Sequence, residues 1–139
     1  MASTGFDLDT EWEPRRVEPS SPWPVDTAHL ARYTLGDKAL EREVLGLFAA
    51  EAHARIEAFK QARSEKEWKM AAHTLKGSGR AVGAWRVAHV AQEAERLAGV
   101  LDREACAAAI RSIEEAAAEA LAYIARLHPS GEMQLKRSA

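Results

Sequence analysis

Apolar residues recur at spacings of three and four between about residues 26 and 128, which is the spacing of one face of an α-helix. No segment has the strict alternation that is typical of a half-buried strand. The pattern therefore predicts a short helix followed by four longer ones. The expected helices span Asp26 through Tyr33, about 38–63, 68–80, about 84–98, and Asp102 to Pro129.

Start and stop signals of helices fall at the breaks in this pattern. Short polar side chains accept the free N–H groups of a first helical turn, and Ser64 with Glu67 has the spacing of a capping box. Glycine commonly ends a helix because it adopts left-handed backbone angles without a steric penalty. The predicted caps are Asp26, Asp37, Ser64 and Asp102, and the predicted breaks are Gly36, Gly83, Gly99 and Pro129.

The helix over about 38–63 is long enough to be a principal strut of a bundle. Its apolar residues predict one buried stripe. The stripe is expected to comprise Leu40, Val44, Leu47, Phe48, Ala52, Ile56 and Phe59.

Helices of this length joined by short connections predict an all-α fold, an antiparallel four-helix bundle over residues 26–128 with the short first helix as a cap over one end. Residues 1–25 are rich in proline and are expected to form an extended arm. Residues 129–139 are expected to form a tail. Trp12 and Trp23 leave open whether the arm packs on the bundle, because large aromatic side chains favour burial.

The composition narrows the function classes. The chain has 139 residues, of which 47% are hydrophobic, 29% charged and 6% aromatic, which fits one helical domain. A net charge of -2 argues against a nucleic-acid partner. No stretch approaches the ~20 apolar residues of a membrane span, no leader peptide is evident, and Cys106 has no partner for a disulfide. We therefore expect a soluble, cytoplasmic protein without a membrane partner.

One stretch, with the sequence AAHTLKGSGR, combines a histidine with cations and glycines. In a helix, Lys69, His73, Lys76, Gly77 and Arg80 share one face. The chain is thus expected to present an exposed histidine flanked by cations, of which Lys76 is expected to be exposed. The opposite, buried face is expected to hold Trp68, Ala71, Ala72, Leu75, Gly79 and Val82.

The neighbours of this histidine restrict the chemistry it could carry out. No metal site is expected, because no other histidine lies three or four residues from His73, no cysteines are paired, and neighbouring lysines would repel a cation. Hydrolysis also fits poorly, since no Gly-x-Ser-x-Gly elbow is present. A structural alternative stays open, in which Gly77 and Gly79 permit close helix packing and His73 is an incidental surface residue.

The neighbours of His73 suit a phosphorylated imidazole. A phosphoryl group adds close to two negative charges, and Lys76, one turn away, can reach its oxygens. Lys69 and Arg80 add to the positive field. Gly77 leaves room beside the ring for the acidic pocket of another protein, although glycine inside a helix costs roughly 1 kcal/mol relative to alanine.

The segment Ala72–Ser78, followed by Val82-Gly83-Ala84, resembles the histidine-containing phosphotransfer (HPt) domain of bacterial phosphorelays. The resemblance extends over about residues 25–127. It includes the landmarks Leu35-Gly36-Asp37, Leu47-Phe48, Trp68 and Leu97.

The resemblance implies a monomeric phosphoryl carrier without a cofactor, and not an enzyme. His73 would accept a phosphoryl group from an aspartyl-phosphate receiver domain, such as that of a hybrid histidine kinase, and pass it to the receiver of a response regulator. By position, Lys76 would be the cation near the phosphoryl group and Gly77 the small residue that opens the docking face. The Mg²⁺-binding groups would belong to the partner receiver.

Family members commonly hold the second ring nitrogen with a polar residue of the following helix. Glu95 occupies that place in an ungapped match, and Gln92 lies one turn earlier as the alternative. Met70 and Ala81 are expected at the rim of the docking surface, where methionine can adapt to more than one partner.

Two rival functions remain. One is a helical adaptor that binds and sequesters a receiver or kinase through the same face without carrying phosphate. The other is a dimeric phosphotransferase like that of histidine kinases, which requires a four-helix assembly of two chains. The sequence names neither the cognate kinase and regulator nor the pathway and the direction of net phosphoryl flow.

Overall fold

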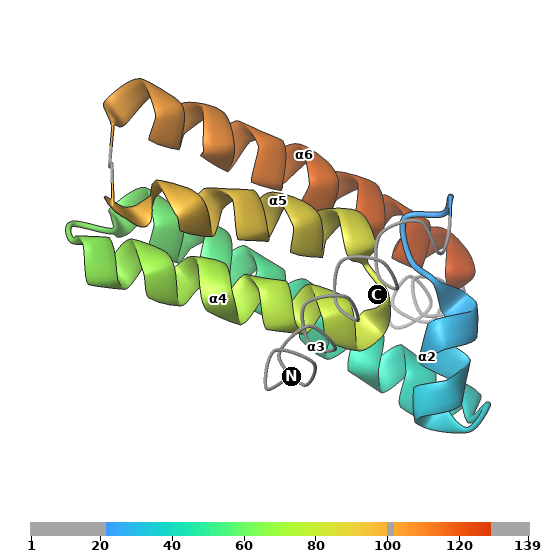
Figure 1. Cartoon of the computed structure of the whole chain (residues 1–139). Coiled ribbons are helices and arrows are strands. Elements are labelled where there is room, and N and C mark those ends of the chain that lie inside the picture. Colours follow the sequence, from blue (N-terminus) through green and yellow to red (C-terminus); the bar gives the residue numbers. More distant parts are fainter. Residues whose placement is uncertain (1–21, 100–101, 129–139) are drawn as a thin grey trace, which may run out of the picture.

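The structure is a computed structural model of the 139-residue chain, and it describes residues 22–99 and 102–128. All regular elements of these residues are helical, which confirms the predicted all-α class. The elements are α2 (Thr27–Thr34), α3 (Lys38–Gln61), α4 (Glu65–Val82), α5 (Trp85–Glu95), a 3-10 turn (Arg96–Gly99) and α6 (Arg103–Leu127) (Figure 1).

The predicted caps of the helices are confirmed. The carboxylates of Asp26, Asp37 and Asp102 accept first-turn backbone N–H groups at 3.1, 3.1 and 2.9 Å. At the start of α4, the Ser64 hydroxyl accepts the backbone N–H of Glu67 at 3.1 Å, and the Glu67 carboxylate accepts that of Arg63 at 2.7 Å. The contacts to the four cap side chains satisfy donors that a first helical turn leaves without an intrahelical partner, and the Glu67 contact satisfies the N–H of the residue before the Ser64 cap.

The helix ends differ from the predicted ones by a few residues. α3 ends at Gln61 rather than 63, and α4 extends beyond the predicted 68–80 on both sides, to Glu65–Val82. α4 ends because Gly83 adopts a left-handed conformation with φ of 80°. The helix expected over 84–98 continues only to Glu95, after which the chain tightens into the 3-10 turn, a common way for a helix to finish.

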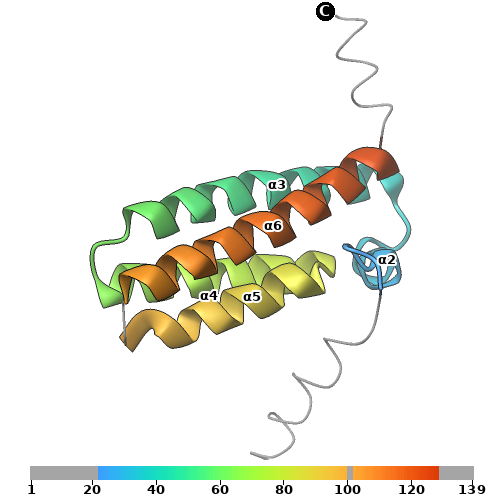
Figure 2. The ribbon, with the colours of Figure 1, turned by 90° about the horizontal axis from the view of Figure 1, so that it is seen from above.

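The four longer helices lie side by side, and α2 lies at one end of them (Figures 1 and 2). α4 packs against both α3 and α5, and α6 packs against α5 and α3. α2 contacts α3 and α4. The largest fully buried side chains come from most of these elements and include Leu30, Leu45, Leu75, Val87 and Ile113.

The buried stripe predicted for α3 is partly wrong. Leu47 is 65% exposed and Leu40 is 40% exposed, whereas Leu45, which the predicted stripe leaves out, is 1% exposed. The apolar pairs Val44-Leu45 and Leu47-Phe48 allow two stripes about 100° apart. The stripe that is buried is the one that faces the other helices, and sequence periodicity alone does not choose between them.

The chain just before α2 contacts the bundle. Val25 is fully buried, the backbone N–H of Asp26 donates to the carbonyl of Gly83 at 2.9 Å, and the ring of Trp23 stacks on Tyr123 with centroids 6.2 Å apart. Trp12, the remainder of the predicted arm and the predicted tail lie outside the described residues.

Candidate functional site

The two faces predicted for the central helix are found in α4. Trp68, Ala71, Ala72, Leu75, Gly79 and Val82 are all buried. On the other face the side chain of His73 is 70% exposed, and Lys69 and Gly77 are exposed as well. The amphipathic pattern thus fixes which way His73 points, since burial of the apolar face leaves the imidazole toward solvent.

Two close contacts fix how α4 lies against α5. Near the start of α4, the buried indole N–H of Trp68 donates to the carbonyl oxygen of Ala94 at 2.7 Å, and its ring packs edge-on against Phe59 of α3. Near the end of α4, a Cβ on Gly79 would lie 3.0 Å from the backbone nitrogen of Ala88. This distance is tighter than most Cβ contacts, so any side chain here would require the backbone of α5 to shift by a few tenths of an ångström. His73 lies between these two contacts, so the register of the facing helix is held on both sides of it.

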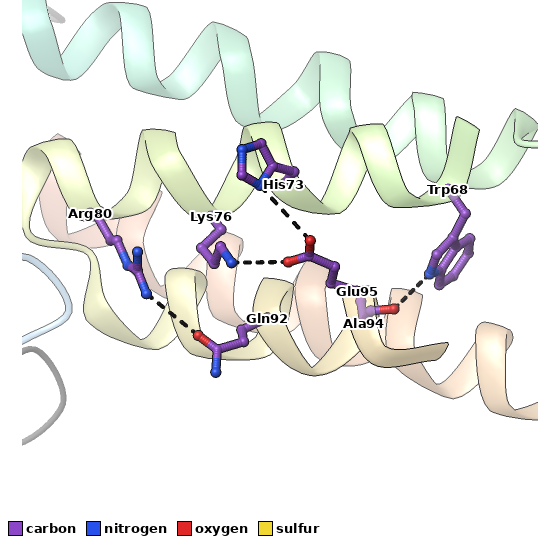
Figure 3. Close-up of polar contacts among 7 residues, drawn as sticks. All are labelled: Trp68, His73, Lys76, Arg80, Gln92, Ala94 and Glu95. Carbon is purple, nitrogen blue, oxygen red and sulfur yellow. Dashed lines mark hydrogen bonds and ion pairs between the residues drawn. The ribbon is translucent and has the colours of Figure 1, made fainter. Parts of the chain in front are cut away.

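Glu95 of α5 lies between His73 and Lys76 (Figure 3). One carboxylate oxygen is 3.8 Å from Nδ1 of His73, which is longer than a hydrogen bond, and the other accepts from Nζ of Lys76 at 2.9 Å. The Glu95 side chain is 20% exposed. Because Nδ1 faces the carboxylate, Nε2 is the ring nitrogen directed away from Glu95.

The predicted exposure of Lys76 is wrong. Its side chain is only 17% exposed because the ammonium group reaches across to Glu95. A lysine can bury its methylene stem along a helix surface while its charged end finds a partner. The cation closest in sequence to His73 on this face is therefore already paired with a carboxylate.

Arg80 and Gln92 contact each other, and Lys69 is exposed. Arg80 reaches α5, where Nη2 lies 3.5 Å from the amide oxygen of Gln92 (Figure 3). Of the two candidates for the second ring nitrogen, the structure therefore brings Glu95 to the ring, and Gln92 contacts Arg80 instead. Lys69 is exposed on the same face as His73.

Gly77 and Gly79 have different surroundings. A Cβ on Gly77 would meet no atom within 4 Å, so close packing within this chain does not require glycine there. Gly79 is the residue that permits close packing, against α5. Met70 and Ala81, the predicted rim residues, are exposed.

Sequence reasoning missed the contact between Trp68 and Ala94 and the pairing of Lys76 with Glu95. The first had a usable signal, because a buried indole N–H usually finds an acceptor. The second depends on the register between α4 and α5, which no local pattern of the sequence specifies.

Neither a group of metal ligands nor a membrane-spanning helix is found in the described residues. In residues 22–99 and 102–128, no three His, Cys, Asp or Glu side chains are grouped so that they could hold a metal ion. No helix in the described part of the chain is both long enough and apolar enough to cross a membrane.

Comparison with known proteins gives one finding. The family model described as the Hpt domain matches residues 43–126, which include α4 and α5, most of α3 and all but the last residue of α6. No curated protein and no solved structure shows significant similarity to the chain.

Proposed function

Because the chain belongs to the Hpt domain family, whose members are phosphocarriers of two-component signalling and interact with receiver domains, we propose that His73 is its phospho-acceptor. His73 takes the phosphoryl group from an aspartyl-phosphate receiver, that of a hybrid histidine kinase, and passes it to the receiver of a response regulator. The observation that carries this proposal is an exposed imidazole whose Nδ1 faces the carboxylate of Glu95.

The chemistry follows from the orientation of the ring. The lone pair of Nε2 attacks phosphorus, the Nε2–P bond forms, and the bond from phosphorus to the partner's aspartate oxygen breaks, so that aspartate leaves as a carboxylate. The ring then carries a positive charge shared with Nδ1–H. Glu95, 3.8 Å from Nδ1, stabilises that charge and keeps the proton on Nδ1. The reverse steps deliver the phosphoryl group to the second receiver.

Lys76 has two tasks in this proposal. Its ammonium group holds the Glu95 carboxylate in place at 2.9 Å, and its charge offsets part of the negative charge that arrives with the phosphoryl group. Lys69 and Arg80 contribute to the positive field around the site. Gly77 allows the partner to approach the ring, since its backbone is open to solvent.

The remaining features of the proposal concern the whole protein. It is a cytoplasmic monomer, and its helices form an antiparallel four-helix bundle that α2 caps at one end. The acidic groups that bind Mg²⁺ belong to the receiver. The chain itself positions a nucleophile and supplies charge, and it needs no cofactor.

A transfer assay tests the proposal. Receiver domains carrying labelled aspartyl phosphate are mixed with the purified protein, with His73→Gln and with a matched control, His53→Gln, which alters another exposed histidine. We expect acid-labile, base-stable label on the wild type and the control, and none on His73→Gln. Equal labelling of His73→Gln would refute the site. Binding of receivers without any transfer would favour an adaptor.

A further inference from the structure

A cavity of about 440 Å³ lies at the end of the bundle where α2 is found (Figure 1). It is lined by Pro22, Trp23 and Pro24, which precede α2, by Trp85, Arg86 and His89 of α5, and by Glu119 of α6. Arg86 and Glu95 are about two and a half helical turns apart, so they lie on opposite sides of α5. The cavity is therefore separate from the carboxylate that faces His73.

Two indole rings line the cavity, and each is held by a neighbouring side chain. The ring of Trp23 stacks on Tyr123, with centroids 6.2 Å apart. The indole N–H of Trp85 donates to the carboxylate of Asp26 at 3.0 Å, and His29 packs edge-on against the Trp85 ring. These contacts restrict the rotation of both indoles. The aromatic walls are thus formed before a ligand arrives, which lowers the entropy cost of binding.

The polar part of the lining carries one positive and one negative charge in contact. Nη1 of Arg86 donates to Oε1 of Glu119 at 3.0 Å, and the two side chains are 54% and 49% exposed. An exposed ion pair contributes little to stability, so both side chains can accept a further partner at small cost. A ligand with a single charge would be attracted by one of them and repelled by the other. A ligand with adjacent positive and negative charges satisfies both.

We propose that this cavity binds a free aromatic α-amino acid in its zwitterionic form. The aromatic ring packs against the indoles of Trp23 and Trp85, the α-carboxylate pairs with Arg86, and the α-ammonium group pairs with Glu119. The volume lies within the ~300–1,000 Å³ of small-molecule sites, which combine apolar walls with a few polar groups that set the orientation of the ligand. This inference goes beyond the proposed function and does not depend on it.

The test is a titration of the full chain, followed by ¹H–¹⁵N NMR of the indole N–H groups. The probes are L-phenylalanine, N-acetyl-L-phenylalanine amide, which keeps the ring without the charges, and L-alanine, which keeps the charges without the ring. We expect L-phenylalanine to shift the resonances of Trp23 and Trp85 in a saturable way. The resonance of Trp68, which is buried in α4, should not shift. The other two probes should bind at least ~10-fold more weakly, because each loses one kind of contact.

Two matched variants test the contact with the ammonium group. Glu119→Gln should weaken the binding of L-phenylalanine ~10-fold. Glu115→Gln should bind as the wild type does, because Glu115 is exposed one turn earlier on α6 and does not line the cavity. An unchanged Trp68 resonance verifies that each variant is folded. Equal weakening by both substitutions would contradict the inference, since it would show a general effect of charge.

Two further outcomes would overturn the inference. One is the absence of a saturable shift with L-phenylalanine. The other is equal affinity for the N-acetyl amide, which would identify the occupant as an aromatic side chain of another protein. No receiver domain enters this titration, so its failure leaves the proposed role of His73 unaffected, and a failure of phosphoryl transfer leaves this cavity unaffected.

Discussion

The two faces of α4 belong to the same helix but are determined by different neighbours. The inner face packs against the rest of this chain: Trp68 donates to Ala94, and Gly79 lies so close to the backbone of Ala88 that a Cβ there would be 3.0 Å from its nitrogen. The outer face is open, with His73 exposed and nothing within 4 Å of a Cβ on Gly77. Glycine therefore has different surroundings at two positions of the same helix, Gly77 and Gly79. Gly79 packs closely against α5, whereas Gly77 has open space where its side chain would be.

Replacing each of the two glycines by leucine should give the largest difference between the two faces of α4. Gly79→Leu should lower the free energy of unfolding by about 3 kcal/mol, because the side chain must displace backbone atoms of α5. Chemical denaturation measures this change.

The matched control is Gly77→Leu, two residues away on the open face. It should leave the protein at least as stable as the wild type, since a better helix former replaces glycine in an exposed position, while phosphoryl transfer from a receiver slows. Similar destabilisation by both substitutions would show that the two faces do not differ as described.

A smaller effect is expected from the indole contact on the inner face. Trp68→Phe removes the N–H that donates to Ala94 at 2.7 Å and leaves a buried carbonyl oxygen without that donor. The free energy of unfolding should fall by about 1.5 kcal/mol. Denaturation curves give the value, and an unchanged midpoint would mean that the contact does not hold α4 against α5.

A substitution of Glu95, on the neighbouring helix α5, tests the role of its carboxylate. Glu95→Gln keeps the size of the side chain and removes the charge that faces Nδ1 of His73 and Nζ of Lys76. The rate of transfer to His73 should fall ~10-fold, which corresponds to roughly 1.4 kcal/mol of lost transition-state stabilisation. Rapid-quench kinetics measure the rate. Gln92→Glu is the control, because Gln92 contacts Arg80; a larger loss in that variant would contradict the assignment.

The smallest effect is expected on the outer face away from the ring. Lys69→Ala removes an exposed cation, whose contribution solvent and salt largely screen, so transfer should slow only about twofold at low ionic strength. The difference should vanish when the assay is repeated at high salt. A large loss that salt does not reduce would place Lys69 in direct contact with the phosphoryl group.

Local patterns of the sequence predicted the features that depend on local structure. The caps at Asp26, Asp37, Ser64 and Asp102 are each made by residues three apart, and the inner face of α4 follows from the 3.6-residue period.

Features that depend on how two helices meet were not accessible in this way. The choice between Leu45 and Leu47 as the buried residue of α3 depends on the neighbouring helices, and the burial of Lys76 depends on the position of Glu95 on α5. The resemblance to the HPt domain supplied Glu95 and Gln92 as candidates, and the geometry distinguishes them by what each one contacts.

In the proposed function, His73 is phosphorylated on the ring nitrogen that faces away from Glu95. The most direct measurement is ³¹P and ¹⁵N NMR of the ¹⁵N-labelled protein after transfer from a phospho-receiver. We expect one phosphohistidine, at His73, with phosphorus bonded to Nε2 and the proton on Nδ1. Phosphorus on Nδ1, or on any residue other than His73, would contradict it.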